Sequence, residues 1–371
     1  MFHLTSRPRP LPPIQLNLPK GWNSLTTEQV EGVCRILIDG AKKQTATGSF
    51  TQIELMTRVF FLLSGLEITG GPFEDENAED EIDRDANRWF ECQYADKTVR
   101  ARRQSHGGKI LPIKITVAEI QLLTIGHHEL KGEDKITLVP GPLGWILGRS
   151  ELTIFPYPTL TLPDTQVKSR KPQSVTLQGP NPLMDGTSWR QYRTTADLVH
   201  YLQRAENNLI NMRRNSLRYS SETIRRQEGI VDDVRCQLLA NIFLRSIPHI
   251  DPETGQQTTG YFYTSSQLSD NAYLFRGFPD EKFQAILLWW QGMMGYLSKQ
   301  FPKVFRTNKE VGKQTGSDDP LRLYTRSITT MIKYAAESEE EVNRTTYTVI
   351  LQHMQDMADE NDRIRDIKKR H

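Results

Sequence analysis

The segment 280–305 constrains the fold of this 371-residue chain more than any other. Large apolar side chains follow one another there at helical spacing, and Phe-Pro-Lys-Val-Phe closes the segment. They cover more than one helical face, whereas a surface helix needs only one apolar stripe. We therefore expect this helix at the centre of a core or in an interface. Its candidate partner-binding residues are Trp289, Trp290, Met293, Met294 and Tyr296.

The same spacing predicts helices towards both ends of the chain. A first helix begins at Thr26 or Thr27 and is expected to end near Gly40, and a second begins at Thr51 and ends at Gly65. Further helices are expected over the ranges 196–217, 222–245 and 337–367, and one more is expected to start at Asp318-Asp319-Pro320.

The middle of the chain differs from its ends. Eight acidic residues crowd the segment 74–85 and basic residues follow it, so we expect a solvated loop there or an exposed partner surface. Between residues 152 and 177, prolines are mixed with β-forming residues. Proline cannot donate to a central ladder, which predicts edge strands or extended arms. Residues 251–260 are expected to form a polar loop.

These patterns predict a mainly α protein with helical N- and C-terminal parts and a central Pro-rich β or extended section. The length fits two or three domains, or one domain with a large insertion. The expected organisation is an extended N-terminal arm over 1–20, a helical hairpin over 21–70, a charged loop over 71–110, a β-rich or extended section over 111–190 and a helical domain over 191–371.

Composition limits the kind of function. Lys and Arg total 47 against 45 Asp and Glu, so the net charge of +2 creates no global field that attracts nucleic acid or a membrane surface. The three cysteines lie far apart without CxxC spacing, which favours buried thiols in a reducing compartment. The N-terminal residues are rich in proline and lack the apolar run of a signal peptide or a membrane span. We expect a protein that is made and kept inside a cell.

The motifs for catalysis or metal binding are weak. His127-His128 with Glu129 offers two histidines, where zinc needs three or four converging ligands, so hydrogen-bonded histidines are the simpler interpretation. The Gly-rich stretches 105–109 and 141–148 lack the spacing of phosphate-binding loops and are predicted as turns. Acidic pairs such as Asp232-Asp233 suit helix starts, and no nucleophile elbow occurs. We expect no catalytic residue, no cofactor and no metal.

An arginine cluster over residues 204–226 offers an alternative function. Arginine on one helical face is a phosphate-binding device, and the candidate phosphate-contacting residues are Arg213, Arg214, Arg218 and Arg225. Glutamates are interspersed among them and the chain is nearly neutral, so a solvated, salt-bridged face is the favoured interpretation.

Four motifs, in this order, carry a resemblance to a protein family. They are Leu-Pro-Lys-Gly-Trp-Asn-Ser-Leu from Leu18, Leu-Gln-Gly-Pro-Asn-Pro-Leu from Leu177, Trp-Arg-Gln-Tyr from Trp189 and Leu-Leu-Trp-Trp-Gln-Gly-Met-Met-Gly-Tyr-Leu from Leu287. With the amphipathic terminal helix, they resemble uncharacterised prophage proteins of gut-type bacteria that are encoded among tail-morphogenesis genes. The acidic segment 74–85 and the long Arg-rich helices depart from that pattern.

The resemblance implies a non-enzymatic structural or tail-assembly protein of a phage-derived particle. Such a protein works in the bacterial host cytoplasm during assembly, or remains in the virion, and binds other particle proteins. It leaves a homo-oligomer open, whereas nucleic acid and membrane are not expected partners. The Pro-rich segments 7–19 and 154–177 would then reach onto adjacent subunits. The alternatives are an intracellular nucleic-acid-binding module that uses the Arg-rich helices 204–226 and, third, an enzyme.

Overall fold

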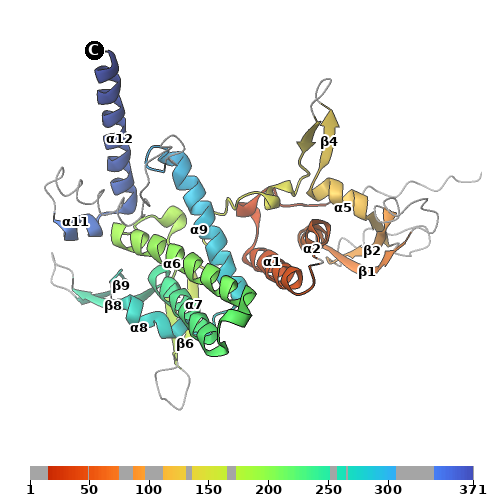
Figure 1. Cartoon of the computed structure of the whole chain (residues 1–371), viewed down its shortest axis with the longest axis horizontal. Coiled ribbons are helices and arrows are strands. Elements are labelled where there is room, and N and C mark those ends of the chain that lie inside the picture. Colours follow the sequence, from red (N-terminus) through yellow and green to blue (C-terminus); the bar gives the residue numbers. More distant parts are fainter. Residues whose placement is uncertain are drawn as a thin grey trace, which may run out of the picture. The chain divides into compact units, whose positions relative to one another are not determined.

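The computed structural model describes residues 16–48, 50–74, 87–96, 112–130, 136–164, 173–250, 257–264, 266–305 and 338–370. These residues are mostly helical, which confirms the expected mainly α class (Figure 1). The chain divides into two compact units: unit 1 is Met1–Leu152 with Asp280–Gln291, and unit 2 is Thr153–Pro279 with Gly292–His371. The sequence pattern predicted consecutive sections and gave no sign that a later piece of chain belongs to unit 1.

Two helices form the first part of unit 1. The short 3-10 turn η1 (Trp22–Ser24) comes first, and the helices α1 (Thr27–Thr47) and α2 (Gln52–Ser64) follow it. The Thr51 hydroxyl accepts a 3.2 Å hydrogen bond from the backbone N–H of Glu54 and so caps the start of α2. Gly65 ends α2 with a φ of 69°, a left-handed conformation that glycine adopts without strain. The second predicted helix is therefore confirmed.

The prediction that α1 ends near Gly40 is wrong. The helix continues to Thr47, and Gly48 ends it with a φ of 67°. Gly40 lies inside the helix because the ring of Phe50 passes over it: a Cβ built on Gly40 would lie 2.3 Å from the Phe50 Cε1 atom. Glycine here serves close packing and does not stop the helix.

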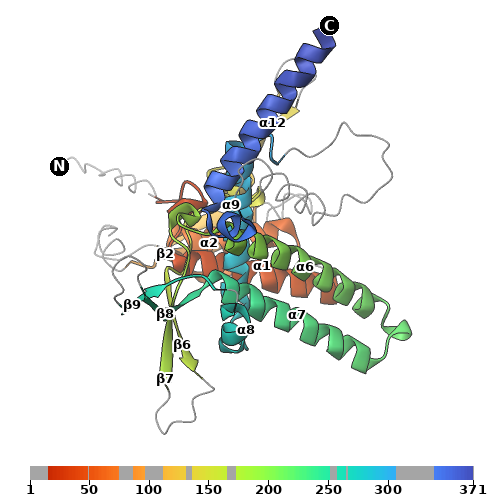
Figure 2. The same cartoon turned by 90° about the vertical axis from the view of Figure 1, so that its left-hand side faces the viewer.

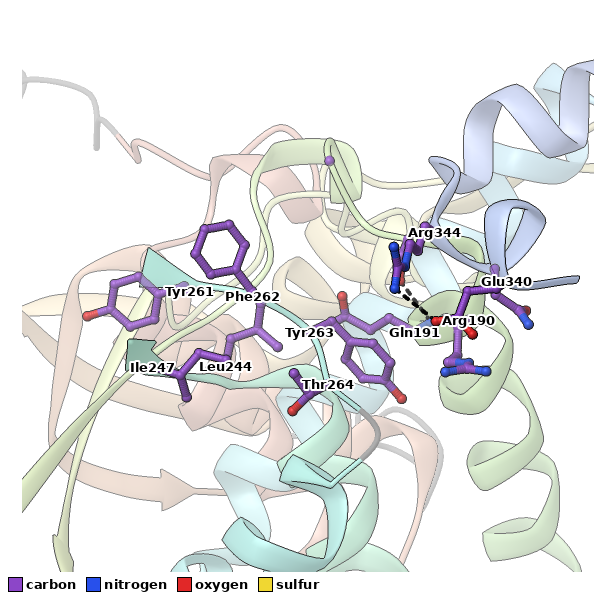
Figure 3. Close-up of a pocket in the computed structure, with 13 residues that line it drawn as sticks. Arg190, Gln191, Leu244, Ile247, Tyr261, Phe262, Tyr263, Thr264, Glu340 and Arg344 are labelled. Carbon is purple, nitrogen blue, oxygen red and sulfur yellow. Dashed lines mark hydrogen bonds and ion pairs between the residues drawn. The ribbon is translucent and has the colours of Figure 1, made fainter. Parts of the chain in front are cut away.

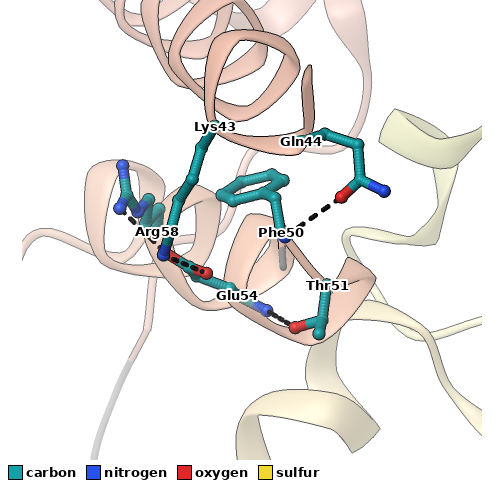
Figure 4. A network of polar contacts seen from close by, with 6 residues as sticks. All are labelled: Lys43, Gln44, Phe50, Thr51, Glu54 and Arg58. Carbon is teal, nitrogen blue, oxygen red and sulfur yellow. Dashed lines mark hydrogen bonds and ion pairs between the residues drawn. The ribbon is translucent and has the colours of Figure 1, made fainter. Parts of the chain in front are cut away.

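Polar contacts fix the junction between α1 and α2 (Figure 4). The backbone N–H of Phe50 donates to Gln44 Oε1 at 3.0 Å. The Glu54 carboxylate accepts from Lys43 Nζ at 3.0 Å and from Arg58 Nη2 at 2.8 Å. The hydrogen bond from Lys43, supported by Arg58, holds the pKa of Glu54 below its ordinary value. These bonds connect residues on both sides of the turn.

An antiparallel sheet with the order β1-β2-β3 follows in unit 1. Its strands are β1 (Leu66–Phe73), β2 (Trp89–Tyr94) and β3 (Ile113–Thr116). Strand β2 lies inside the range 71–110 that was expected to be a charged loop, so that expectation is wrong for residues 89–94. The reason is an apolar side of the strand: Cys92 is fully buried opposite Ile113. Residues 75–86 and 97–111 lie outside the described residues.

The remaining elements of the first 152 residues follow β3 directly. The elements are α5 (Val117–Thr124), the hairpin of β4 (His127–Leu130) with β5 (Ile136–Val139), and the 3-10 turn η2 (Gly144–Leu147). Trp22 packs edge-on against Trp145 with ring centroids 5.4 Å apart, and the Trp145 indole N–H donates to the Pro19 carbonyl at 3.2 Å. These contacts attach the N-terminal residues to the end of the unit.

A long helical hairpin dominates unit 2 (Figure 2). It consists of α6 (Trp189–Arg214), the turn η4 (Ser216–Arg218) and α7 (Ser221–Ile242). The Ser188 and Ser220 hydroxyls cap the two helices by accepting from the backbone N–H groups of Gln191 and Thr223. Leu202 and Leu238 are almost completely buried and belong to the apolar stripes of the two helices.

A four-stranded antiparallel sheet lies beside the hairpin, in the order β6-β7-β8-β9. Its strands are β6 (Thr159–Asp164), β7 (Gln173–Gln178), β8 (Leu244–Ile250) and β9 (Gln257–Tyr261). Strand β6 is at one edge of the sheet. Pro163 is tolerated there because an edge strand forms backbone hydrogen bonds to a neighbouring strand on one side only. Strand β9 is at the other edge and occupies part of the range 251–260. The loop expected there is therefore wrong for residues 257–260, since they pair with β8.

Shorter elements complete unit 2: η3 (Pro182–Met184), α8 (Gln267–Asn271), η5 (Ala272–Phe275), α11 (Glu339–Arg344) and α12 (Tyr347–Arg370). The single helix expected over 337–367 is broken between α11 and α12. The Trp189 N–H donates to the Thr345 carbonyl at 2.8 Å, and the Tyr347 N–H donates to the Thr187 carbonyl at 3.0 Å. This short β-bridge takes the backbone out of the helix. The helix expected from Asp318 lies outside the described residues.

Candidate partner-binding site

Unit 2 contains a pocket of about 630 Å³ between the start of α6, the strands β8 and β9, and the helix α11 (Figure 3). Its lining combines aromatic side chains, backbone and two arginines. The lining residues are Gly186, Ser188, Arg190, Gln191, Leu244, Ile247, Tyr261, Phe262, Tyr263, Thr264, Glu340, Asn343 and Arg344.

The aromatic side of the pocket comes from the end of β9. Tyr261 and Phe262 are large apolar side chains that remain 40% and 43% exposed. The Phe262 ring lies over Gly260. A Cβ atom built on Gly260 would lie 2.4 Å from the Cε2 atom of Phe262, so glycine at this position leaves the space that the ring occupies. Because β9 is the last strand in its sheet, one side of its backbone has no ladder partner among the described residues.

Two lining residues, Gln191 and Tyr263, belong to a buried polar network that joins α6, α7 and the segment after β9. The Asn241 amide donates to the Gln191 carbonyl at 3.0 Å and to Thr195 Oγ1 at 2.8 Å. Its Oδ1 accepts from the Tyr263 hydroxyl at 2.9 Å. The Gln191 side-chain amide donates in return to the Asn241 carbonyl at 2.9 Å. Burial raises the pKa of Tyr263, so its hydroxyl stays protonated and donates.

The cationic side of the pocket comes from two helices. Arg190 lies in the first turn of α6, and Arg344 ends α11 with a 2.9 Å ion pair to Glu340. The ion pair spans one helical turn and is exposed, so it competes weakly with a carboxylate that enters the pocket. Within the described residues Arg190 has no acidic partner. The pocket therefore carries more positive than negative charge.

Helix α11 also supplies a polar atom that lacks a partner. Asn343 is only 4% exposed, and its Oδ1 accepts no hydrogen bond from the described residues. A buried acceptor without a donor costs free energy. The bridge between Ser188 and Thr346 holds the end of this helix beside the start of α6. A ligand with a donor group would satisfy the Asn343 acceptor.

These groups suit binding by stacking, backbone pairing and charge. Histidine and cysteine do not occur in the lining, and its serine is the N-cap of α6. In the described ranges, no group of three His, Cys, Asp or Glu side chains comes together as a metal ion would require. Among the described helices, none combines the length and the apolar character needed to cross a bilayer.

The dominant predicted helix, α9 (Asp280–Gln300), places its candidate residues mostly in the interior. Trp289, Trp290 and Met293 are 1%, 5% and 0% exposed. Met294 and Tyr296 are half-buried, and Met294 Sδ accepts from the Tyr192 hydroxyl at 3.8 Å. The first three residues are buried within their own chain. Of the five candidate residues, only Met294 and Tyr296 are therefore exposed enough to contact a partner.

The candidate arginines lie at the turn end of the α6–α7 hairpin, whereas the pocket lies at the opposite end, where α6 begins. Arg213 pairs with Glu228 across the hairpin at 2.7 Å. The other three candidates are Arg214, Arg218 and Arg225, and they form no ion pair within the described part of the chain. None of these four arginines lines the pocket, and neither do the candidate residues of α9.

The remaining weak motif has a plain structural role. His127 and His128 lie in strand β4, not in a helix, and His127 Nε2 is 3.0 Å from Glu129 Oε1. This exposed pair agrees with the hydrogen-bonded interpretation. The pocket itself was missed by sequence reasoning because Tyr261, Phe262 and Tyr263 directly follow the expected loop. A run of three aromatics next to a polar segment was the signal that could have indicated it.

Comparison with known proteins adds no relative from which a role could be transferred. No family model, no curated protein and no solved structure matches the chain.

Proposed function

We propose that this chain is a non-enzymatic assembly protein that works through protein–protein contacts, as a structural or tail-assembly component of a phage-derived particle. The observation that carries the proposal is the pocket at the outer strand β9, because it combines a strand edge with exposed aromatic rings. The phage context rests on the sequence resemblance. In this proposal the central Pro-rich section and the N-terminal arm contribute further extended contacts to neighbouring subunits.

The pocket fits an extended polypeptide segment better than a compact small molecule. A strand added beside β9 would gain main-chain hydrogen bonds, while side-chain pockets next to the edge select the sequence. Tyr261 and Phe262 would pack against an apolar or aromatic side chain of the partner, and such rings commonly carry much of the energy of an interface. Arg190 and Arg344 would bind a carboxylate of the same segment.

Site-specific photocrosslinking tests the proposal. A photoreactive phenylalanine analogue at Tyr261 should give one discrete polypeptide adduct in host cells that assemble the particle. The matched control is the same analogue at Tyr201, a tyrosine on α6 that is 52% exposed and lies about 15 Å along the helix from the lining residue Gln191. Replacing Arg190 with Glu should reduce the Tyr261 adduct. Equal adducts at Tyr201 and Tyr261, or no polypeptide adduct at Tyr261, would contradict the proposal.

The second candidate function is nucleic-acid binding by the Arg-rich helices 204–226. The observation in its favour is the exposure of Arg214, Arg218 and Arg225 at the hairpin end. Binding to phosphates releases counterions, so retention of DNA should fall steeply with salt. Replacing these three arginines should abolish that retention. If the protein does not retain DNA at low salt, this candidate fails.

A further inference from the structure

The first turns of helix α12 are packed into unit 2, whereas its last turns are exposed. Tyr347, Ile350 and Leu351 are each 1% exposed. Over the range 359–368, every residue except Asp362 is exposed. This stretch is about 15 Å long, and Figure 2 shows the helix extending away from α6 of the same unit. A helix end of this length gains little stability from its own hydrogen bonds in water, so a partner surface would stabilise it.

The contacts that its own chain makes with this part of α12 lie on one side of the helix. Lys303 Nζ pairs with Asp362 at 2.9 Å and also with Asp359, and the Lys303 backbone N–H donates to Gln355 Oε1 at 3.0 Å. Because 3.6 residues complete a helical turn, Ile364 lies roughly 140° to 180° around the helix from these three residues. The side that carries Ile364, which is 41% exposed, is therefore open.

The open side of α12 carries the heptad pattern of a coiled coil. Met354 and Asn361 occupy successive a positions, and Met357 and Ile364 occupy successive d positions. The neighbouring register would place the charge of Glu360 in the seam, which costs free energy. Asparagine at an a position specifies the register and the number of strands, at a cost in stability. The pattern therefore favours pairing with a helix that presents the same residues at the same level.

The charges beside the seam favour a parallel pair. Glu360 is at position g and Arg365 is at position e, five residues later, which is the spacing of the salt bridges between parallel helices. The ion pair of Glu360 with Arg363 at 3.2 Å is exposed, so it competes weakly. Ile367, at the next g position, is 50% exposed and adds apolar area beside the seam. Lys368 follows at the last a position, where its ammonium group reaches water at the helix end.

We infer that α12 of one copy pairs with α12 of a second copy as a parallel coiled coil over residues 354–368. Charge complementarity selects this partner, because two copies in register pair Glu360 with Arg365 twice and place the two Asn361 side chains together. The contact is isologous and gives a two-fold symmetric dimer. A seam of two heptads is short beside specific interfaces that bury roughly 1,600 Å² in total, so the dimer is weak and depends on concentration. The inference is independent of the pocket beside β9, so its failure and a failure of the crosslinking at Tyr261 are separate results.

Sedimentation velocity of the full-length protein tests the inference. The wild type should show a reversible monomer–dimer equilibrium as its concentration rises. Ile364→Lys should raise the dissociation constant by roughly tenfold or more, because it places a charge in the seam. The matched control is Val349→Lys, since Val349 is also on α12 and is 46% exposed but occupies a c position away from the seam. This control should leave the dissociation constant unchanged, and circular dichroism checks that both variants are folded.

Charge exchange tests the pairing across the seam. Glu360→Arg alone and Arg365→Glu alone should each raise the dissociation constant roughly fivefold at low salt, because each variant brings like charges together twice. The double variant should restore the wild-type dissociation constant. A double variant that dimerises no better than the single variants overturns the parallel arrangement.

Disulfide trapping tests the register. The three native cysteines are buried, so an introduced thiol reports on the helix. Mild oxidation with diamide should link Asn361→Cys into a covalent dimer, whereas Asp366→Cys, at the outer f position, should stay monomeric under the same conditions. Equal linkage of the two variants overturns the inference. So does a wild-type protein that is monomeric at every concentration, or a dimer that Ile364→Lys leaves intact.

Discussion

Replacing Asn241 with Leu should destabilise unit 2 by about 3 kcal/mol. The substitution keeps the branched shape and the number of side-chain heavy atoms, and it removes three hydrogen bonds: those to the Gln191 carbonyl, to Thr195 Oγ1 and from the Tyr263 hydroxyl. Each contributes roughly 1 kcal/mol net. The total stays near 3 kcal/mol because Thr195 Oγ1 still donates to the Gln191 carbonyl at 2.9 Å, so neither group is left without a partner.

Thermal unfolding followed by circular dichroism measures this effect. For a unit of this size, 3 kcal/mol corresponds to a fall in Tm of roughly 6 to 12 °C. Replacing Tyr263 with Phe removes one of the three bonds and should cost about 1 kcal/mol. The double variant should be scarcely less stable than the Asn241→Leu variant, since the two changes share one bond. An Asn208→Leu change on the exposed side of α6 is the control. If the free energy of unfolding of Asn241→Leu is within about 1 kcal/mol of the wild-type value, the network does not stabilise unit 2 as described.

Three further predictions concern unit 1. Replacing Gly40 with Ala should lower the free energy of unfolding by about 1 to 3 kcal/mol, because the new Cβ would meet the Phe50 ring at 2.3 Å. Chemical denaturation measures this loss. An unchanged denaturation midpoint would show that the ring moves aside without cost. Burial raises the pKa of the Cys34 thiol to about 12, so at pH 8 a disulfide reagent should label it only as fast as the protein opens, and rapid native labelling would contradict its burial. The hydrogen bond from Lys43 lowers the pKa of Glu54, so this carboxylate stabilises the fold above its ordinary value of 4.5 and the effect disappears as pH falls through the lowered pKa. The stability difference between wild type and Glu54→Gln should accordingly shrink in acid, and a difference independent of pH would refute that account.

Local signals predicted the helices well where caps and apolar spacing agree. Thr51 and Gly65 bound α2 as the sequence indicated, because an N-cap hydroxyl and a left-handed glycine act within a few residues. Gly40 misled because the same residue type also permits close packing. Only the position of the Phe50 ring shows whether Gly40 ends the helix or allows close packing. That ring reaches Gly40 because the chain turns back after α1.

The candidate site depended on contacts that sequence spacing does not contain. Arg190, Tyr261 and Arg344 are separated by many residues and meet because α6, β9 and α11 pack in one unit. The apolar helix α9 was expected in a core or an interface, and burial of Trp289 places that residue in the core. Periodicity shows that a face must be covered, but it does not tell which surface covers it.

The sequence by itself determined the mainly helical class, the caps of individual helices and the separation of charge into an acidic segment and an arginine cluster. These properties depend on residues that are near neighbours along the chain. The tertiary structure alone decided that α9 contributes to both units, that β9 is an edge strand and that the arginines stand at a projecting hairpin end. Those features arise from packing between distant segments, where the free energy of burial selects one arrangement among many that the local pattern allows.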